Sequence, residues 1–242
     1  MTYESFSLID SARDRHGFVF ICDHASNEIP ASFDNLGLPV DRLQQHIAYD
    51  IGAAETTRRL AAHFGAAAVL SRFSRLLVDP NRAADRRDVI PEESDGVVIP
   101  GNIGLTEAAR QARFDAFYTP YHDAVAAAFK AVGEAGLFIS VHSFTPEMSG
   151  EKRPWEIGVL WNHDAATAAA TLGALRALTP FAVGDNEPYT GKLYNHTMDV
   201  RAAPLKARHV TLEIRQDLIA DADGVGAVAE ALAPVLEAVA EG

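Results

Sequence analysis

Two apolar stretches of this chain each run directly into a histidine. Residues Phe18–Cys22 are apolar, branched or aromatic, and Asp23 and His24 follow at once. Residues 137–141 repeat the pattern, because Leu-Phe-Ile-Ser-Val leads into His142. Short runs of this kind are typical of buried strands, and α/β folds place reacting groups just beyond the carboxyl ends of their strands. We therefore expect a buried sheet with a polar site at its strand ends.

Segments typical of strands alternate with segments typical of helices. We expect strands at residues 18–22, 66–70, 76–78, 137–141, 157–161 and 209–215. We expect helices at 41–64, 106–132, 164–178 and 224–240, the second of them kinked or divided at Pro120. Residues 1–16 are interpreted as irregular, and 83–102 and 144–154 as loops. This alternation predicts an α/β fold with a largely parallel or mixed sheet, in one domain over residues 1–242.

The charge and the apolar runs limit the partners. The formal net charge is -12 at pH 7. Nucleic acids and anionic membranes are bound by clustered Lys and Arg, so we expect neither as a partner. No apolar run approaches the roughly 20 residues needed to cross a bilayer, and residues 1–5 lack the basic and apolar regions of a signal peptide. We expect a cytoplasmic protein, and nothing in the sequence indicates its oligomeric state.

The one cysteine, Cys22, excludes an intrachain disulfide and a metal site with several cysteines. Because side chains alternate along a strand, its thiol should face away from Asp23. We interpret Cys22 as a buried core residue rather than a nucleophile.

The titratable residues at the strand ends are of the types found in metal sites. His24, His142 and Glu213 lie at the ends of three expected strands. His46 and Asp50 lie four residues apart on an expected helix, where they are either a solvated polar pair or a third arm of the same site. Two imidazoles and a carboxylate are usual ligands of a catalytic zinc, and a carboxylate off the metal can act as general base. Because no His-Glu-x-x-His motif is present, structural histidines with a solvated strand face explain the same pattern.

Four arginines fall near strand ends or in the expected site loops: Arg75, Arg82, Arg153 and Arg215. The paired N–H donors of arginine suit it to binding carboxylates. A surface salt bridge explains any one of them, but four in such places favour an anionic substrate. The chain has neither a Gly-x-Ser-x-Gly motif nor a glycine-rich nucleotide-binding motif.

Seven segments, taken together, resemble the signatures of the N-formylglutamate amidohydrolase family. They run in order at residues 22–30, 46–53, 74–82, 118–122, 140–146, 153–155 and 213–219. The resemblance implies a relation to the zinc carboxypeptidase and aspartoacylase hydrolases. It therefore implies a three-layer α/β/α fold with a mixed central sheet and a metal at the strand ends. It also implies hydrolysis of N-formyl-L-glutamate to formate and glutamate, the last step of one route of histidine degradation.

By this resemblance, His24 and His142 are the two histidine ligands of the metal. The third ligand of the carboxypeptidases is a glutamate, and Asn27 stands at the matching position here. We therefore choose Asp50 as the third ligand. Two other carboxylates are kept as alternatives, Glu28 and Asp23. The expected metal is Zn²⁺, with another divalent metal as the alternative.

The resemblance also implies the roles of the remaining residues. Glu213 resembles the general base that, with the metal, activates a water. Arg82, or else Arg153, is expected to stabilise the developing oxyanion. Five residues are expected to bind a small acidic N-acyl amino acid: Arg75, Asn81, Arg153, Arg215 and Ser143. The alternatives are hydrolysis of another N-acyl amino acid or a small peptide amide, and non-catalytic binding of an acidic metabolite.

Overall fold

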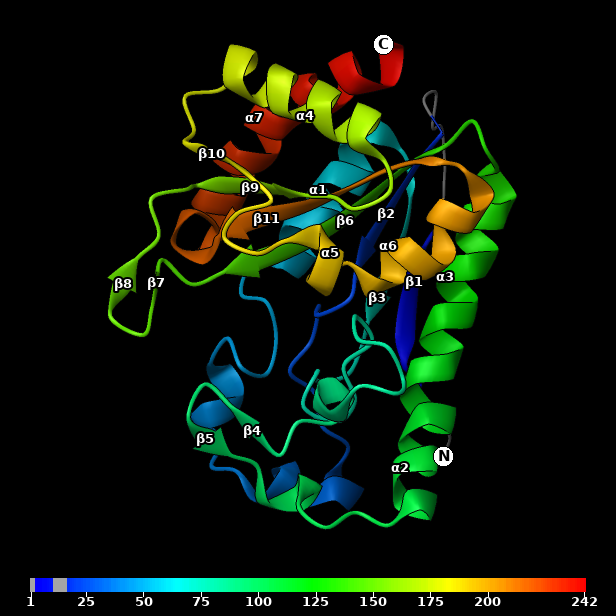
Figure 1. Cartoon of the computed structure of the whole chain (residues 1–242), viewed down its shortest axis with the longest axis vertical. Helices are drawn as coiled ribbons and strands as arrows, with labels where there is room; N and C mark the ends of the chain where they lie inside the picture. Colours follow the sequence, from blue (N-terminus) through cyan, green and yellow to red (C-terminus); the bar gives the residue numbers. More distant parts are fainter. Residues whose placement is uncertain (1–2, 11–16) are drawn as a thin grey trace.

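A mixed sheet of seven strands runs through the described part of the chain, residues 3–10 and 17–242 of the computed structural model (Figure 1). The central strands β3 (Ala67–Ser71), β2 (Phe18–Cys22), β6 (Leu137–Phe144) and β11 (Arg208–Arg215) are neighbours in this order and run parallel. At one edge β1 (Phe6–Ile9) pairs antiparallel with β3. At the other, β9 (Ile157–Leu160) pairs antiparallel with β11, and β10 (Val183–Asp185) pairs parallel with β9.

Helices cover both faces of the sheet, which confirms the predicted three-layer α/β/α architecture (Figure 1). On one face lie α1 (Ala53–Phe64), α4 (Ala165–Leu178) and α7 (Ala222–Glu241). On the other lie α3 (Thr119–Val132) and α6 (His196–Arg201). The helix α2 (Glu107–Arg113) extends the column of α3, and α5 (Gly191–Tyr194) leads into α6. Within the described ranges, no helix is both long enough and apolar enough to cross a membrane.

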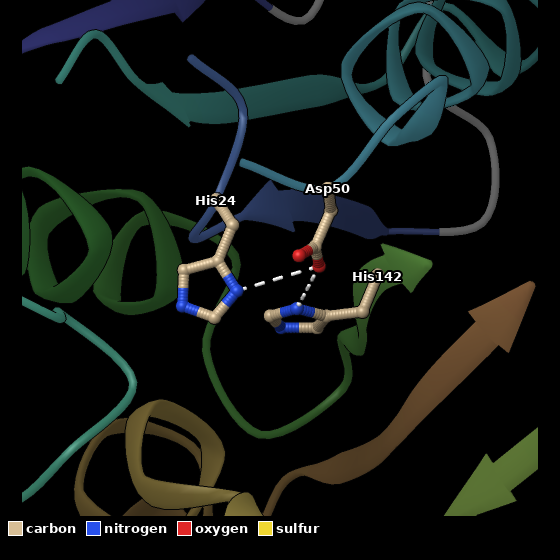
Figure 2. Close-up of side chains that lie close together, drawn as sticks. All are labelled: His24, Asp50 and His142. Atoms are coloured by element: carbon tan, nitrogen blue, oxygen red, sulfur yellow. Dashed lines mark hydrogen bonds and ion pairs between the residues drawn. The ribbon is translucent and has the colours of Figure 1, made fainter. Parts of the chain in front are cut away.

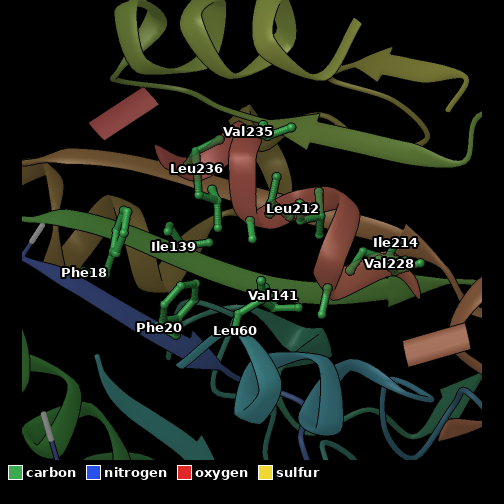
Figure 3. Packing of buried hydrophobic residues seen from close by; sticks show 14 of the residues in the cluster. Phe18, Phe20, Leu60, Ile139, Val141, Leu212, Ile214, Val228, Val235 and Leu236 are labelled. Atoms are coloured by element: carbon green, nitrogen blue, oxygen red, sulfur yellow. The ribbon is translucent and has the colours of Figure 1, made fainter. Parts of the chain in front are cut away.

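Alternate residues of β2 divide between two cores. Phe18, Phe20 and Cys22 belong to the core that contains α1 and α7 (Figure 3), whereas Val19 and Ile21 belong to the core that contains α3. A central parallel strand is apolar throughout because both of its faces are covered. Burial raises the pKa of the Cys22 thiol well above its ordinary value. The interpretation of Cys22 as a core residue is confirmed.

The helix predicted over residues 41–64 is wrong in its first half, because the α-helix begins only with α1. Leu43 packs into the core beside α3, whereas Leu60 packs into the opposite core. The chain must therefore pass from one side of the sheet to the other between them. Gly52 makes this passage: its φ is 78°, and a Cβ there would lie 2.1 Å from the carbonyl oxygen of Ile219. That close approach requires glycine.

Three other expectations differ from the structure. Residues 76–78 are not a strand: the chain turns at 75–77, and the apolar side chains of 76–78 pack into a core without a neighbouring strand to pair with. In the stretch 1–16, interpreted as irregular, β1 is a strand; residues 1–2 and 11–16 lie outside the described residues. The two expected loops each contain a small hairpin, β4–β5 (Glu93–Ser94, Val97–Val98) and β7–β8 (Glu147–Met148, Glu151–Lys152).

The remaining predicted elements are confirmed, with ends shifted by a few residues. The helix expected over 106–132 is divided by a π-helical turn, Phe114–Tyr118, which ends two residues before Pro120. The pyrrolidine ring of Pro120 removes one backbone donor from the helix at that point. That residues 1–242 form one domain stays a prediction.

The strand order places a site between β2 and β6. Along the chain β2 is followed by β3 on one side, and β6 then lies on the other side of β2. The order of connection therefore reverses between β2 and β6. Ligands of α/β proteins bind at such reversal points, outside the carboxyl ends of the strands. Both histidines singled out in the sequence lie at this end of these two strands.

Candidate active site

Three residues from three separate segments meet there (Figure 2). His24 follows β2, Asp50 lies shortly before α1, and His142 lies near the end of β6; all three are buried. The Oδ2 atom of Asp50 is 3.3 Å from His24 Nδ1 and 2.8 Å from His142 Nδ1. One ligand atom from each residue lies within 4.8 Å of the others, so the group can hold a metal ion.

Each of the two histidines is held by a further carboxylate. His24 Nε2 donates to Asp79 Oδ1 at 2.8 Å, and His142 Nε2 donates to Asp23 Oδ2 at 3.1 Å. A histidine that donates one ring N–H to a carboxylate presents the lone pair of its other nitrogen to a metal. In both residues that other nitrogen is Nδ1, and both Nδ1 atoms face Asp50 (Figure 2). The donor set and its support fit a metal ion such as zinc.

The charges of the group favour a bound cation. Burial opposes the charged form of Asp50, but the adjacent His24 and His142 hold the pKa of Asp50 well below its ordinary value. Burial also opposes the protonated form of His142, yet hydrogen bonds to Asp23 and Asp50 raise the pKa of that imidazole. The site thus attracts positive charge between the histidines and Asp50. Metals bind such groups in their deprotonated form and replace the protons.

The three carboxylates considered for the third ligand have different partners in the structure. Asp50 faces both histidines, whereas Asp23 is committed to the Nε2 atom of His142. The carboxylate of Glu28 lies 3.0 Å from the Tyr3 hydroxyl. Within the described residues, Asp50 is the carboxylate of the group that can hold a metal. We keep Asp50 as the proposed third ligand.

A fourth titratable residue, Glu213, lies beside this group. Glu213 of β11 pairs with His142 of β6, and both line the same cavity. Only 7% of Glu213 is exposed, and its Oε2 atom has no hydrogen-bond partner among the described residues. Burial raises the pKa of Glu213 to about 7. At neutral pH this carboxylate can therefore both accept and release a proton.

The cavity over these residues has a volume of about 300 Å³, which suits a small molecule. Arg75 and Arg82 line it. The guanidinium of Arg75 donates to Asp79 at 2.7 Å and to Asp50 at 3.5 Å, so it holds two carboxylates of the site. The guanidinium of Arg82 lies 4.8 Å from the centre of the Tyr194 ring.

Two of the other predicted substrate-binding residues line the cavity and are held by the protein. Asn81 accepts from the Thr197 N–H at 3.1 Å through its side-chain oxygen. Ser143 donates to the Ile51 carbonyl at 2.8 Å through its hydroxyl, and its backbone N–H donates to Asp50 at 3.2 Å. Both side chains are therefore fixed in orientation at the cavity wall.

Arg153 and Arg215 are not among the described residues that line this cavity. Arg153 lies next to it, with its guanidinium 4.8 Å from the centre of the Tyr189 ring, which does line it. Arg215 pairs with Asp217 at 2.8 Å and with Glu156 at 3.6 Å. Their roles in substrate binding stay predictions.

Some residues of the site had no role in the sequence interpretation. Asp79 follows an apolar run just as Asp23 does, and this pattern could have identified it as a site residue. Tyr189 and Tyr194 lie in a segment without periodicity, and no local pattern marks them. His46 lines the cavity and lies 3.2 Å from Asp95, outside the group that can hold a metal.

Fold and cavity together define an α/β protein with a buried polar site at the carboxyl end of a mixed sheet. Comparison with protein families then gives the particular membership. The model of the N-formylglutamate amidohydrolase family matches residues 16–220, so the chain belongs to that family. It is accordingly a hydrolase that acts on amide bonds.

Two solved structures are similar over nearly the whole chain. Gene product Atu2144 from Agrobacterium tumefaciens is 35% identical with a TM-score of 0.93, covering 99% of this chain and 96% of that one. The N-formylglutamate amidohydrolase from Ralstonia eutropha JMP134 is 18% identical with a TM-score of 0.74, covering 98% and 97%. The second likeness shows the shared fold. A comparison with curated proteins gives no match.

Proposed function

We propose that the protein hydrolyses the N-acyl amide of an acidic amino acid such as N-formyl-L-glutamate, with a divalent metal held by His24, Asp50 and His142. One observation carries this proposal. The buried carboxylate of Glu213, with an unpartnered oxygen, shares a small cavity with a buried group that can hold a metal. Family membership supplies the amide bond as the target.

A zinc ion in this group would polarise the acyl carbonyl and lower the pKa of water. The chain prepares the ligands for that ion before it binds. Asp79 and Asp23 fix the orientation of the two imidazoles, so that Nδ1 of each is presented. Arg75 holds Asp79 and Asp50 together from the other side.

Glu213 is the proposed general base. Its carboxylate takes a proton from the attacking water and later gives that proton to the leaving nitrogen, which releases formate and the free amino acid. A pKa of about 7 suits both transfers near neutral pH. Its Oε2 atom has no hydrogen-bond partner among the described residues, and the residue lines the cavity in which the substrate is proposed to bind.

Arg82 is proposed to stabilise the negative charge that develops on the acyl oxygen, since a fixed cation in a buried site is most effective there. Asn81, Ser143, Arg75 and Arg153 are proposed to bind the rest of the substrate, and Arg215 is the weakest candidate because two carboxylates already hold it. Family membership also supports a small-molecule partner. We further propose a cytoplasmic setting and a place at the end of one route of histidine degradation.

The test is an assay of the purified protein after metal removal and reloading with zinc. N-formyl-L-glutamate, N-acetyl-L-glutamate, N-formyl-L-glutamine and a small peptide amide are compared. We expect one equivalent of zinc and the highest kcat/KM with N-formyl-L-glutamate. A higher kcat/KM with another member of the panel would identify that compound, rather than N-formyl-L-glutamate, as the substrate. Absence of hydrolysis of every member, with one zinc bound, would refute the proposed reaction.

A further inference from the structure

One helical column supplies three donors to a single backbone segment. The column consists of α2, the π-helical turn and α3, and the segment is residues 77–82. Arg113 donates to the Leu77 carbonyl at 2.9 Å, and His122 Nε2 donates to the Pro80 carbonyl at 2.9 Å. The Tyr118 hydroxyl donates to the Arg82 carbonyl at 3.0 Å.

The donors are locked in their roles by further contacts. His122 Nδ1 accepts from the Arg201 side chain at 3.2 Å, which leaves the ring proton on Nε2 to face Pro80. The Tyr118 hydroxyl lies 2.8 Å from His196 Nε2; when this N–H donates to it, the hydroxyl proton is directed to the Arg82 carbonyl. Arg113 and His122 are 3% and 1% exposed, so these bonds are shielded from water.

The π-helical turn is what aligns the donors. Arg113 and Tyr118 are five residues apart, which in an α-helix of 3.6 residues per turn places them about 140° apart around the axis. A π turn bonds residues i and i+5 and so brings them towards one side. Tyr118 and His122 are four apart and share a face of the α-helix. The sequence segment 118–122 is one of those that resembled the family, and the proposed chemistry gives it no role.

The segment that these donors hold has no strand ladder of its own. Residues 76–78 are buried and lie outside the sheet, so their carbonyls need partners from elsewhere. The segment carries Asp79, which orients His24, and then Asn81 and Arg82, which line the cavity. A small displacement of this backbone would therefore move three groups of the site at once.

We propose that Arg113, Tyr118 and His122 are positioning residues, which hold the backbone of residues 77–82 so that Asn81 and Arg82 are presented to the substrate. The inference rests on the proposed function only for the part played by Asn81 and Arg82 in catalysis. The holding of the segment stands independently of the reaction.

The experiment compares two variants that each lose a buried histidine-to-carbonyl hydrogen bond. His122→Leu loses the bond to Pro80. The matched control is His209→Leu, because His209 is 3% exposed and its Nδ1 lies 2.8 Å from the Ala207 carbonyl. His209 lies near the start of β11, whereas Glu213 lies near its end. His122→Gln restores an N–H donor, and Tyr118→Phe removes the hydroxyl alone.

Amide hydrogen exchange at Asn81 and Arg82 is measured first, on the zinc-loaded protein. We expect exchange about 10-fold or more faster in His122→Leu and Tyr118→Phe, and unchanged in His209→Leu and His122→Gln. Unchanged exchange in His122→Leu would overturn the inference. So would equal acceleration in His209→Leu.

The kinetic arm compares kcat/KM for the best N-acyl substrate. His122→Leu should fall about 10- to 100-fold, whereas His122→Gln and His209→Leu stay near the wild-type value. Faster exchange with a kcat/KM no lower than that of His209→Leu would also overturn the inference. A wild-type protein inactive on every substrate would refute the proposed function instead, and the exchange rates would still decide whether the column holds the segment.

Discussion

Glu213 and His142 are register partners on the adjacent parallel strands β11 and β6. Because paired residues of parallel strands project from the same face of the sheet, the proposed base and a proposed metal ligand are set side by side by backbone hydrogen bonds. Their spacing does not depend on a loop. The buried position this creates also explains why the pKa of Glu213 is raised to about 7.

Glu213→Gln should abolish turnover and leave the metal site intact. The amide keeps the shape of the side chain but cannot accept a proton from water. We expect kcat to fall by about 10² to 10⁴, with the zinc content of the purified variant unchanged. Near-normal turnover would refute the assignment of the base, and loss of zinc would show that Glu213 is instead a ligand.

The same substitution should also change how the stability of the metal-free protein depends on pH, because it removes the buried carboxylate. The pKa of Glu213 is raised from 4.5 to about 7 in the folded state, so the folded protein retains a proton that the unfolded chain releases. The wild type therefore loses stability relative to Glu213→Gln as pH rises from 4.5 through 7. The difference should reach about 3 kcal/mol above pH 7.

Urea unfolding of both metal-free proteins between pH 4.5 and 8 measures this difference. The other titratable groups are common to the two proteins, so their contributions largely cancel. With saturating zinc the difference should shrink, because a nearby cation favours the charged carboxylate. A difference that does not vary with pH would contradict the raised pKa.

Zinc should stabilise the wild-type protein through Asp50. At free zinc 1,000 times the Kd, binding to the folded state adds about 4 kcal/mol to the free energy of unfolding. If Asp50→Asn weakens binding 100-fold, about 1.4 kcal/mol of that remains at the same zinc concentration. Thermal unfolding with and without zinc measures both values. Asp95→Asn, which also alters a cavity carboxylate but lies outside the group, serves as control; an equal loss in the two variants would argue against Asp50 as ligand.

Replacement of Arg82, which lines the cavity, and of Arg215, which is not among the described residues that line it, should differ in kinetic effect. Arg82→Met removes a cation from the cavity wall, and we expect kcat/KM to fall about 100-fold or more. Arg215→Met removes a cation that Asp217 and Glu156 already neutralise, and we expect a change below about 3-fold. Equal losses would show that Arg215 reaches the substrate when it binds.

The parts of the site that the sequence predicted are those encoded locally. A strand that ends in a histidine can be recognised from ten consecutive residues, and β2 and β6 supplied His24 and His142 in this way. Glu213 was recognised as a charged residue near the end of an apolar strand, and the family resemblance supplied its role. The alternation of strands and helices was likewise sufficient to predict an α/β fold with a largely parallel or mixed sheet, and the family resemblance added the three layers.

The parts that the sequence did not predict depend on contacts between distant segments. Leu43 and Leu60 follow one helical period, yet they pack on opposite sides of the sheet, and the break at Gly52 is explained only by Ile219. Residues 76–78 have the composition of a strand, but within the described residues no strand of the sheet lies beside them to pair with. Arg215 lies at a strand end like the functional residues, and its pairing with Asp217 and Glu156 distinguishes it from them.

The burial of Cys22 gives the molecule a built-in reporter. It is the one thiol of the chain, lies in the core beside α1 and α7, and is 0% exposed. A thiol reagent can reach it only after this side of the molecule has opened. The rate of labelling therefore reports how often the core around Cys22 opens. Labelling with and without zinc would then show whether metal binding at His24, two residues beyond Cys22 at the same end of β2, keeps this part of the core closed. No engineered probe is needed for that measurement.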